Sequence, residues 1–470
     1  METYISPIAN DALSTLCEEY LKNNRILAED YARFDVKRGL RNADGTGVMA
    51  GLTKICSVEG YYVSDGERVP KDGVLIYRGI PMHQIVEACH EENRFGFEEV
   101  VWLLLFGTLP TQVQLKNFTS ILAKCRELPD EFIEDMIMKA PSRDIMNKVA
   151  RSVLALYSFD KAPDDISLAN VLRQSVQLIA QIPAIMAYAY QVKRRVYDHD
   201  SMYLHQNNQN LTMAESILHS IRANSEFTDE EAKLLDTCMM IHAEHGGGNN
   251  STFATRCVTS SGTDTYSAIA AGIGSLKGPR HGGANIKVHH MVADMKAHVQ
   301  NPTDEGQVAD YLTKVIRKEA GDGSGLVYGM GHAVYTLSDP RAVILKQRAE
   351  AFAKKCGRED DFKTLSLIEE LTPQLFAKEK GRNKKICANV DLYSGLIYDM
   401  LGIPEELFTP LFMSARIAGW TAHRIEELSF AGRIMRPAYK SVALPREYIH
   451  LADRTSDFSG QKAYIPSEER

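Results

Sequence analysis

Two histidines lie in glycine-rich segments where a side chain could reach a small substrate. His245 lies in HAEHGGGNNST, where a helix is expected to end and the glycines let the backbone approach a ligand. His281 lies in GPRHGGAN, just before the next expected helix. The positive end of a helix dipole lowers a histidine pKa, and a neutral imidazole can donate a hydrogen bond to a carbonyl. The alternatives are a helix C-terminal cap for His245 and a structural turn histidine for His281.

A third histidine and an arginine share the segment GSGLVYGMGHAVYTLSDPRA, residues 323–342. Four glycines precede His332, which predicts a loop whose backbone amides could face a ligand. Arg341 follows Pro340 at the expected start of a helix, where its planar guanidinium could bind a carboxylate. The alternative is a flexible loop with an incidental histidine.

One carboxylate stands out in KKICANVDLYSG, residues 384–395. Asp391 lies between the apolar residues Val390 and Leu392. Apolar surroundings raise the pKa of a carboxyl group toward that of a useful general base. The alternative is that Asp391 is the N-cap of a helix over residues 392–401, and both interpretations can hold together.

Arg416 interrupts an otherwise apolar helix face in the segment FTPLFMSARIAGWTAHRIEE. Burying a guanidinium is costly unless an anion meets it, so this residue is a candidate substrate ligand. Arg436 lies just beyond the helix. The alternative is an internal ion pair between Arg416 and Glu426 or Glu427.

These residues are separated by segments with helical periodicity. Strand signals are confined to residues 52–78, and Pro183 should kink or divide its long helix. We therefore predict an all-α, mostly helical fold with a small N-terminal β element. The expected helices are 98–106, 111–125, 143–157, 166–192, 227–243, 262–276, 284–299, 303–319, 340–355, 361–378, 392–401 and 404–429.

Composition indicates a large globular protein. The chain has 470 residues, 44% of them hydrophobic, and a net charge of −7, which argues against a general nucleic-acid binder. Its eight cysteines are scattered without C-x-x-C spacing, as expected for reduced intracellular thiols. The first twenty residues resemble neither a signal nor a transit peptide, and no apolar run approaches the ~20 residues of a membrane span. We expect a cytoplasmic enzyme.

Several familiar motifs are missing. The chain has no phosphate-binding loop, no dinucleotide fingerprint after a strand and no H-E-x-x-H. HGGG at 245–248 resembles a lipase oxyanion loop, but the matching G-x-S-x-G is missing. A metallohydrolase using His242, His245 and His281 remains a remote alternative.

In order and spacing, the segments resemble the citrate synthase family. GPRHGGAN is similar to its first catalytic histidine motif, GMGHAVY with DPRA to its second, and NVDLYSG to its aspartate motif. ARIAGWTAHRIEE is similar to the arginine-bearing helix, and the resemblance covers roughly residues 45–450. It implies a two-domain homodimer, with a higher oligomer as the alternative. From charge and hydropathy we expect no nucleic-acid or membrane partner. The large domain would combine residues 1–285 and 400–470, and the small domain, residues 286–399, would close over substrate.

The resemblance also implies roles for the candidate residues. His281 would polarise the thioester carbonyl of acetyl-CoA, Asp391 would remove a methyl proton, and His332 would hydrogen-bond the ketone of oxaloacetate. The oxaloacetate carboxylates would be held by His245, Arg341, Arg416 and, from the partner subunit, Arg436.

Coenzyme A would lie along a glycine-rich loop and meet a basic segment. The implied contacts are Leu326, Val327, Tyr328, Gly329, Gly331, Arg382 and Lys384, with Lys380 and Lys385 as further phosphate candidates. The resemblance implies no metal and no cofactor, since acetyl-CoA is a substrate. The nearest rival is 2-methylcitrate synthase, which uses propionyl-CoA, and a non-catalytic helical scaffold is a remote one.

Overall fold

The computed structural model describes residues 10–64, 67–381, 385–445 and 448–454. Helices dominate, and the strands in this part of the chain form one three-stranded antiparallel sheet near the N-terminus. The predicted mostly helical fold with a small N-terminal β element is therefore confirmed. No helix within the described ranges is both long and apolar enough to cross a membrane.

The chain divides into two compact units. Unit 1 comprises residues 1–50 and 436–470, and unit 2 comprises residues 51–435. Apart from Arg436, every residue predicted for the site belongs to unit 2. The described α-helices of unit 1 are α1 (Asn10–Asn23) and α2 (Ala28–Arg33).

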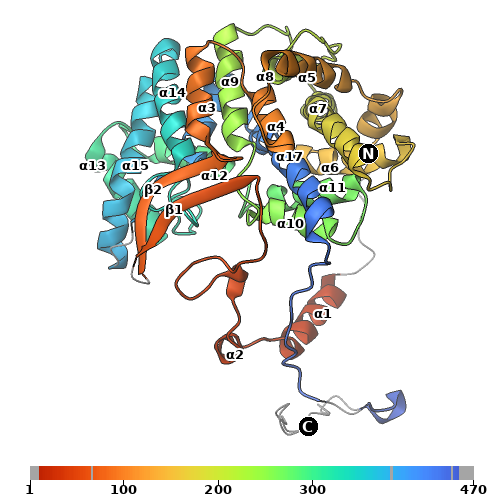
Figure 1. The fold of residues 1–470 in the computed structure, drawn as a ribbon. Coiled ribbons are helices and arrows are strands. Elements are labelled where there is room, and N and C mark those ends of the chain that lie inside the picture. The colour runs from red at the N-terminus through yellow and green to blue at the C-terminus, as the bar shows by residue number, and fades with distance from the viewer. Residues whose placement is uncertain (1–9, 65–66, 382–384, 446–447, 455–470) are drawn as a thin grey trace. The chain divides into compact units, whose positions relative to one another are not determined.

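Unit 2 contains the helices that position the candidate site (Figure 1). Twelve of them agree closely with the predicted ranges, whereas α3 (Met82–Glu91), α8 (Met213–Ile221) and α10 (Asn250–Thr259) were not predicted. Helix α7 runs unbroken across Pro183, so the predicted division there is wrong. Its buried face is held by the neighbouring helices, which outweighs the single hydrogen bond lost at proline. The helices are α3 (Met82–Glu91), α4 (Phe97–Phe106), α5 (Gln112–Cys125), α6 (Ile145–Leu156), α7 (Leu168–Lys193), α8 (Met213–Ile221), α9 (Asp229–His242), α10 (Asn250–Thr259), α11 (Thr265–Lys277), α12 (Ala284–His298), α13 (Glu305–Arg317), α14 (Pro340–Cys356), α15 (Glu359–Lys380), α16 (Asp391–Met400) and α17 (Phe408–Glu426).

The small sheet supports the loop that carries His332. Strand β1 (Cys56–Ser64) pairs antiparallel with β2 (Glu67–Tyr77), and β2 pairs with the short β3 (Ile80–Pro81). A Cβ atom at Gly60 would lie 2.6 Å from the carbonyl oxygen of Val334, and the Gly73 amide donates to Ser338 Oγ at 3.1 Å. The hairpin therefore packs directly against the backbone that follows His332.

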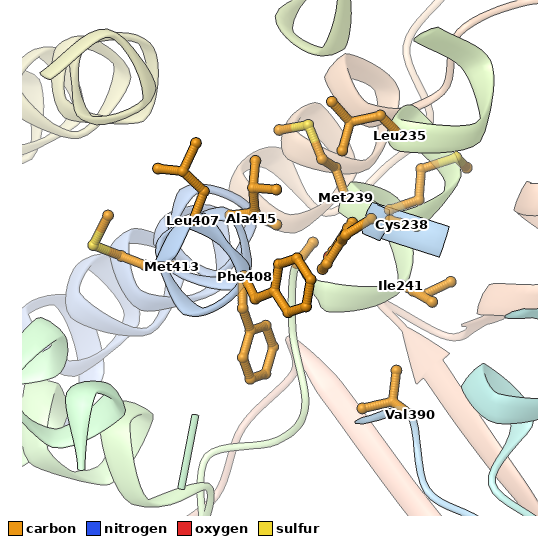
Figure 2. Close-up of a cluster of buried hydrophobic side chains, with 14 of the residues drawn as sticks. Leu235, Cys238, Met239, Ile241, Val390, Leu407, Phe408, Met413 and Ala415 are labelled. Carbon is orange, nitrogen blue, oxygen red and sulfur yellow. The ribbon is translucent and has the colours of Figure 1, made fainter. Parts of the chain in front are cut away.

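Helix α17 is the buried centre of unit 2. Its residues from Phe408 to Arg424 are all buried, and it packs against α4, α7, α9, α10 and α11. Figure 2 shows Phe408 and Ala415 near Cys238 and Met239 of α9. Burying one large apolar side chain contributes about 1.5–3 kcal/mol of stability. The many apolar contacts of α17 therefore fix the position of the polar side chains on the same helix.

Candidate active site

His245 lies among the other predicted site residues. It follows α9, its side chain is buried, and its Nε2 has no hydrogen-bond partner among the described residues. Its ring centroid is 5.1 Å from that of His332 and 5.6 Å from that of Tyr335. Burial is the main reason that the pKa of His245 lies well below its usual value. The positive charges of Arg341 and Arg416 lower the pKa further. The ring is therefore neutral at pH 7 and can donate or accept a hydrogen bond.

The ring of His332 is oriented by its own loop. Its Nδ1 accepts hydrogen bonds from the amides of Val334 and Tyr335, each at 3.1 Å. An Nδ1 that accepts carries no proton, so the neutral ring holds its proton on Nε2. The Tyr335 ring stacks on the imidazole with centroids 4.6 Å apart. His332 is thus prepared to donate from Nε2 to an oxygen of a substrate.

His281 has the opposite tautomer. The Ser251 amide donates to its Nε2 at 3.3 Å, and Ser251 Oγ lies 3.0 Å from the same nitrogen. The proton of the neutral ring is therefore on Nδ1. Burial and, second, the positive charge of Arg416 lower the pKa of His281 to about 4. The imidazole stays neutral near pH 7 and can donate from Nδ1 without bringing a charge.

Asp391 is the first residue of α16, and Val390 occupies the N-cap position. The interpretation of Asp391 as the N-cap is therefore wrong. Burial raises the pKa of Asp391 to about 7; the charges of Arg341 and Arg416 oppose this rise, and that of Asp339 adds to it. Because Arg341 and Arg416 also act on His245, the carboxylate faces the same charged cluster as the histidines. A carboxyl group with this pKa can act as a base at neutral pH.

Arg416 offers two buried donors to an anion. Its Nε donates to the carbonyl oxygen of His242 at 2.6 Å, while Nη1 and Nη2 are buried and meet no partner in the part of the chain that the structure describes. The alternative of an ion pair with Glu426 or Glu427 is wrong, because both carboxylates bind Arg256 at 2.8 Å. Unpaired donors of a buried cation are costly, which favours a carboxylate ligand at this position.

Arg341 is fixed by the residue two positions before it. Asp339 caps α14 by accepting from the Arg341 amide at 3.0 Å, and it also accepts from the guanidinium Nε at 3.0 Å and Nη2 at 2.7 Å. This pair holds the buried guanidinium close to His245 and Asp391. Arg436, by contrast, is exposed and belongs to unit 1.

The predicted coenzyme A loop lies against the segment before Asp391. Gly329 and Gly331 have positive φ angles of 81° and 92°, which glycine adopts without strain. Leu326 is 54% exposed, Val327 is 4% exposed and Tyr328 is partly buried. Of the basic candidates, Arg382 and Lys384 lie outside the described residues, Lys385 is exposed, and Lys380 donates to the Ile316 carbonyl at 3.3 Å.

The residues of the metallohydrolase alternative do not form a ligand group. Both ring nitrogens of His242 are buried and have no partner within the described segments, and the ring packs on Phe412 with centroids 4.4 Å apart. Within the described ranges, no three His, Cys, Asp or Glu side chains are grouped so that they could hold a metal ion. The geometry therefore gives this alternative no support.

Three further residues, which the sequence did not indicate, hold the candidate side chains in place. Ser251 and Asp339 bind His281 and Arg341 as described above, and the Trp420 indole N–H donates to Ser251 Oγ at 3.1 Å. Asp339 precedes a proline at a helix start, a pattern that could have marked it as a cap. Trp420 lies one turn after Arg416, but nothing in the sequence indicates that it reaches Ser251.

Comparisons with known proteins identify the family of the chain. The family model for the citrate synthase C-terminal domain matches residues 42–438. A citrate synthase from Synechocystis is 33% identical over 428 residues, which cover 90% of this chain and 92% of that protein. A 2-methylcitrate synthase from Shewanella oneidensis is 31% identical over 382 residues, covering 81% and 92%.

Solved structures show the same fold. A citrate synthase from Thermotoga maritima superposes with a TM-score of 0.71 at 28% identity, covering 89% of this chain and 99% of that chain. A citrate synthase from Thermoplasma acidophilum, solved with carboxymethyl coenzyme A and oxaloacetate, gives a TM-score of 0.72 at 25% identity, covering 89% and 99%. With the family model covering most of the sequence, the conclusion is that this chain is an acyltransferase and belongs to the citrate synthase family.

Proposed function

We propose that the chain condenses acetyl-CoA with oxaloacetate and, with water, releases citrate and CoA. One observation carries this proposal: His281 and His332 hold their protons on opposite nitrogens, Nδ1 and Nε2, while Asp391 has the pKa of a base. Two neutral donors and one acceptor are what the activation of two carbonyl compounds requires.

The first step forms a nucleophile from acetyl-CoA. Asp391 takes a proton from the methyl carbon, and the electron pair moves onto the thioester oxygen. His281 Nδ1–H donates a hydrogen bond to that oxygen, which stabilises the resulting enolate. A neutral donor suits this step because it supports the oxygen without first having to lose a positive charge.

The second substrate is held by its two carboxylates. We assign His245, Arg341, Arg416 and the partner subunit's Arg436 to them. The partnerless Nη1 and Nη2 of Arg416 support this assignment, since a carboxylate would satisfy both. His332 Nε2–H would then donate to the ketone oxygen, where negative charge develops as the new bond forms.

Carbon–carbon bond formation completes the condensation. The enolate carbon attacks the ketone carbon, and the alkoxide takes the Nε2 proton of His332. The proton that Asp391 removed makes up for this loss. Water then cleaves the thioester of citryl-CoA, giving citrate and the CoA thiol. These steps use only side chains of the protein, so we propose that no metal or bound cofactor takes part. Unchanged turnover after treatment with a chelator is the expected result.

A thiol-release assay tests the proposed reaction. The purified chain is given acetyl-CoA with and without oxaloacetate, and the released CoA thiol is measured. We expect release that depends on oxaloacetate, with citrate formed in equal amount. Thiol release that is the same without oxaloacetate, or no release at all, would show that the proposal is wrong.

A second candidate is 2-methylcitrate synthesis from propionyl-CoA. The similarity to the Shewanella oneidensis protein supports it, because its 31% identity is close to that of the citrate synthases. Initial rates with the two acyl donors decide between them. We expect acetyl-CoA to give the higher kcat/KM, and a preference for propionyl-CoA would reverse the assignment.

The remaining assignments concern assembly and coenzyme A. We propose a homodimer, with residues 286–399 as a small domain that closes against residues 1–285 and 400–470. Leu326, Val327, Tyr328, Gly329 and Gly331 are proposed to line the coenzyme, with Arg382 and Lys384 near its phosphates. A cytoplasmic location is supported by the eight cysteines, all free thiols.

A further inference from the structure

One amide side chain joins the segments that carry His332 and Asp391. The Nδ2 group of Asn389 donates to the carbonyl oxygen of Gly331, the residue before His332, at 2.8 Å. Its Oδ1 accepts from the amide of Asp391 at 3.0 Å. Its own amide donates to the Gly329 carbonyl at 2.9 Å. Three bonds of one residue thus span two segments that are far apart in sequence.

The surrounding backbone makes these segments one rigid piece. Met330 and Ala388 form an isolated antiparallel bridge, and the Gly331 amide donates to the Cys387 carbonyl at 2.7 Å. A Cβ atom at Gly329 would lie 3.0 Å from the Cα of Leu392, so the loop rests directly on α16. Backbone pairing sets the register of the two segments, and the Asn389 side chain acts at the residues next to the reacting groups.

We propose that Asn389 is a positioning residue, which holds the Asp391 carboxylate and the His332 Nε2–H in the relative placement needed for proton abstraction and condensation. The inference deepens the proposed function and rests on it. The residue must both accept from the Asp391 amide and donate to the Gly331 carbonyl. The asparagine carboxamide does both through two separate atoms, whereas a serine or threonine hydroxyl is shorter and glutamine is one carbon longer.

Positioning through the backbone suits the chemistry of a base. No side chain in the described part of the chain donates a hydrogen bond to the Asp391 carboxylate. Such a donor would stabilise the ionised form and weaken the base. Asn389 instead binds the amide of Asp391, so it can place the carboxylate without lowering its basicity. Its bond to the Gly331 carbonyl acts in the same way on His332, through the backbone and not through the ring.

Two variants separate the two bonds of the side chain. Asn389→Ala removes both. Asn389→Ser keeps an oxygen that can accept from the amide two residues on but is too short to reach the Gly331 carbonyl. A matched control is Asn207→Ala: Asn207 is also partly buried and donates through Nδ2 to a main-chain oxygen, that of Ala123 at 3.1 Å, outside the candidate site.

The measurements are kcat, the oxaloacetate KM, and the isotope effect on kcat with acetyl-CoA deuterated at the methyl group. For Asn389→Ala we expect kcat to fall about 10- to 100-fold, as misplacement of reacting groups by about 1 Å does. Oxaloacetate KM should change less than about threefold, since its carboxylate ligands are intact. The isotope effect should increase, because proton abstraction becomes slower than the other steps. Asn389→Ser should lie between Asn389→Ala and the parent.

A purely structural role predicts a different result. If Asn389 only stabilised the fold, activity would fall with the folded fraction, as for Asn207→Ala, and the isotope effect would stay at the parent value. That result, or parent-like kcat in Asn389→Ala, overturns the positioning role. Failure of the proposed function itself is distinguishable, because the parent protein would then show no oxaloacetate-dependent thiol release.

Discussion

The Asp391 carboxyl group is placed where folding and catalysis have opposing requirements. The reaction needs the ionised form, but burial raises the pKa of Asp391 to about 7 and so favours the protonated form in the folded state. In the unfolded chain the group has its ordinary pKa of 3.8. Ionised Asp391 therefore destabilises the fold, as is common for catalytic groups.

Asp391→Asn should abolish turnover and stabilise the protein at alkaline pH. The amide cannot take the methyl proton, so we expect kcat to fall about 10²- to 10⁴-fold, with oxaloacetate affinity nearly unchanged. The destabilising effect of ionisation begins as pH rises above 3.8 and is complete above about 7. The variant should therefore gain about 1–4 kcal/mol of unfolding free energy at pH 8 and almost none at pH 4. Denaturant unfolding at both pH values, together with thiol release, measures this. Near-normal rates would exclude Asp391 as the base.

The pH dependence of kcat/KM should report the same group. Since Asp391 must be ionised in the free enzyme, kcat/KM should fall below pH 7, approaching about tenfold per pH unit. His281 should not contribute above pH 5, because its pKa is about 4. Initial rates between pH 5 and 9 at low acetyl-CoA give the profile. A flat profile from pH 5 to 8 is incompatible with the assigned base.

At the scale of elements, α17 organises the site through successive turns of one helix. Arg416 points its unpartnered donors into the site, Trp420 binds Ser251, and His423 Nε2 donates to Glu244 Oε1 at 3.1 Å. Glu244 in turn accepts from the Gly246 amide at 2.5 Å. The helix thereby holds both histidine-bearing segments, before α10 and before α12, from a single buried face.

The close approach of α17 to the His245 segment depends on a glycine. A Cβ atom at Gly419 would lie 1.9 Å from Glu244 Oε2 and 2.6 Å from the Ala243 carbonyl oxygen. Gly419→Ala should therefore displace this segment, cost at least about 1–3 kcal/mol of stability and lower kcat/KM for oxaloacetate.

Gly274→Ala in α11 is the matched control, because nothing lies within 4 Å of a Cβ there and alanine favours a helix by about 0.5–1 kcal/mol. Thermal unfolding and kinetics of both variants make the comparison. Equal effects of the two substitutions would mean that this contact does not position His245.

At the scale of the whole molecule, we propose that the site is shared between subunits. The chemical residues are in unit 2, whereas Arg436 begins the C-terminal segment of unit 1. We assign Arg436 to the partner's oxaloacetate, so a single subunit would lack one ligand for the dianion. Such sharing would make activity depend on dimerisation.

Hybrid dimers test this sharing. Asp391→Asn and Arg436→Ala subunits are each expected to be nearly inactive alone. When they are co-expressed, one site of each hybrid combines an intact Asp391 with the intact Arg436 of the partner subunit. Random pairing should then restore about a quarter of the parent activity. If Arg436 served its own subunit, the hybrids would have no intact site and mixing would restore nothing.

The sequence by itself determined the helical architecture and the identity of the chemical groups. Periodicity placed twelve helices of unit 2 within a few residues, because this signal is local, but it missed α3, α8 and α10. Helix ends are also fixed by local contacts: Thr228 caps α9 by accepting from the Glu231 amide at 3.2 Å. His245, His281, His332, Asp391, Arg341 and Arg416 were found because a histidine between glycines or a charge among apolar residues is unusual without a ligand.

Only the tertiary structure decided how these groups are prepared for reaction. The tautomers of His281 and His332 depend on the amides of Ser251 and Val334, and no spacing in the sequence shows which ring nitrogen meets an amide. Likewise, the sequence allows Arg416 either an internal glutamate or a substrate as its partner. The structure excludes the glutamates, because Arg256 binds both of them. Hydrogen bonds and burial between distant segments set protonation, and these contacts exist only once the chain has folded.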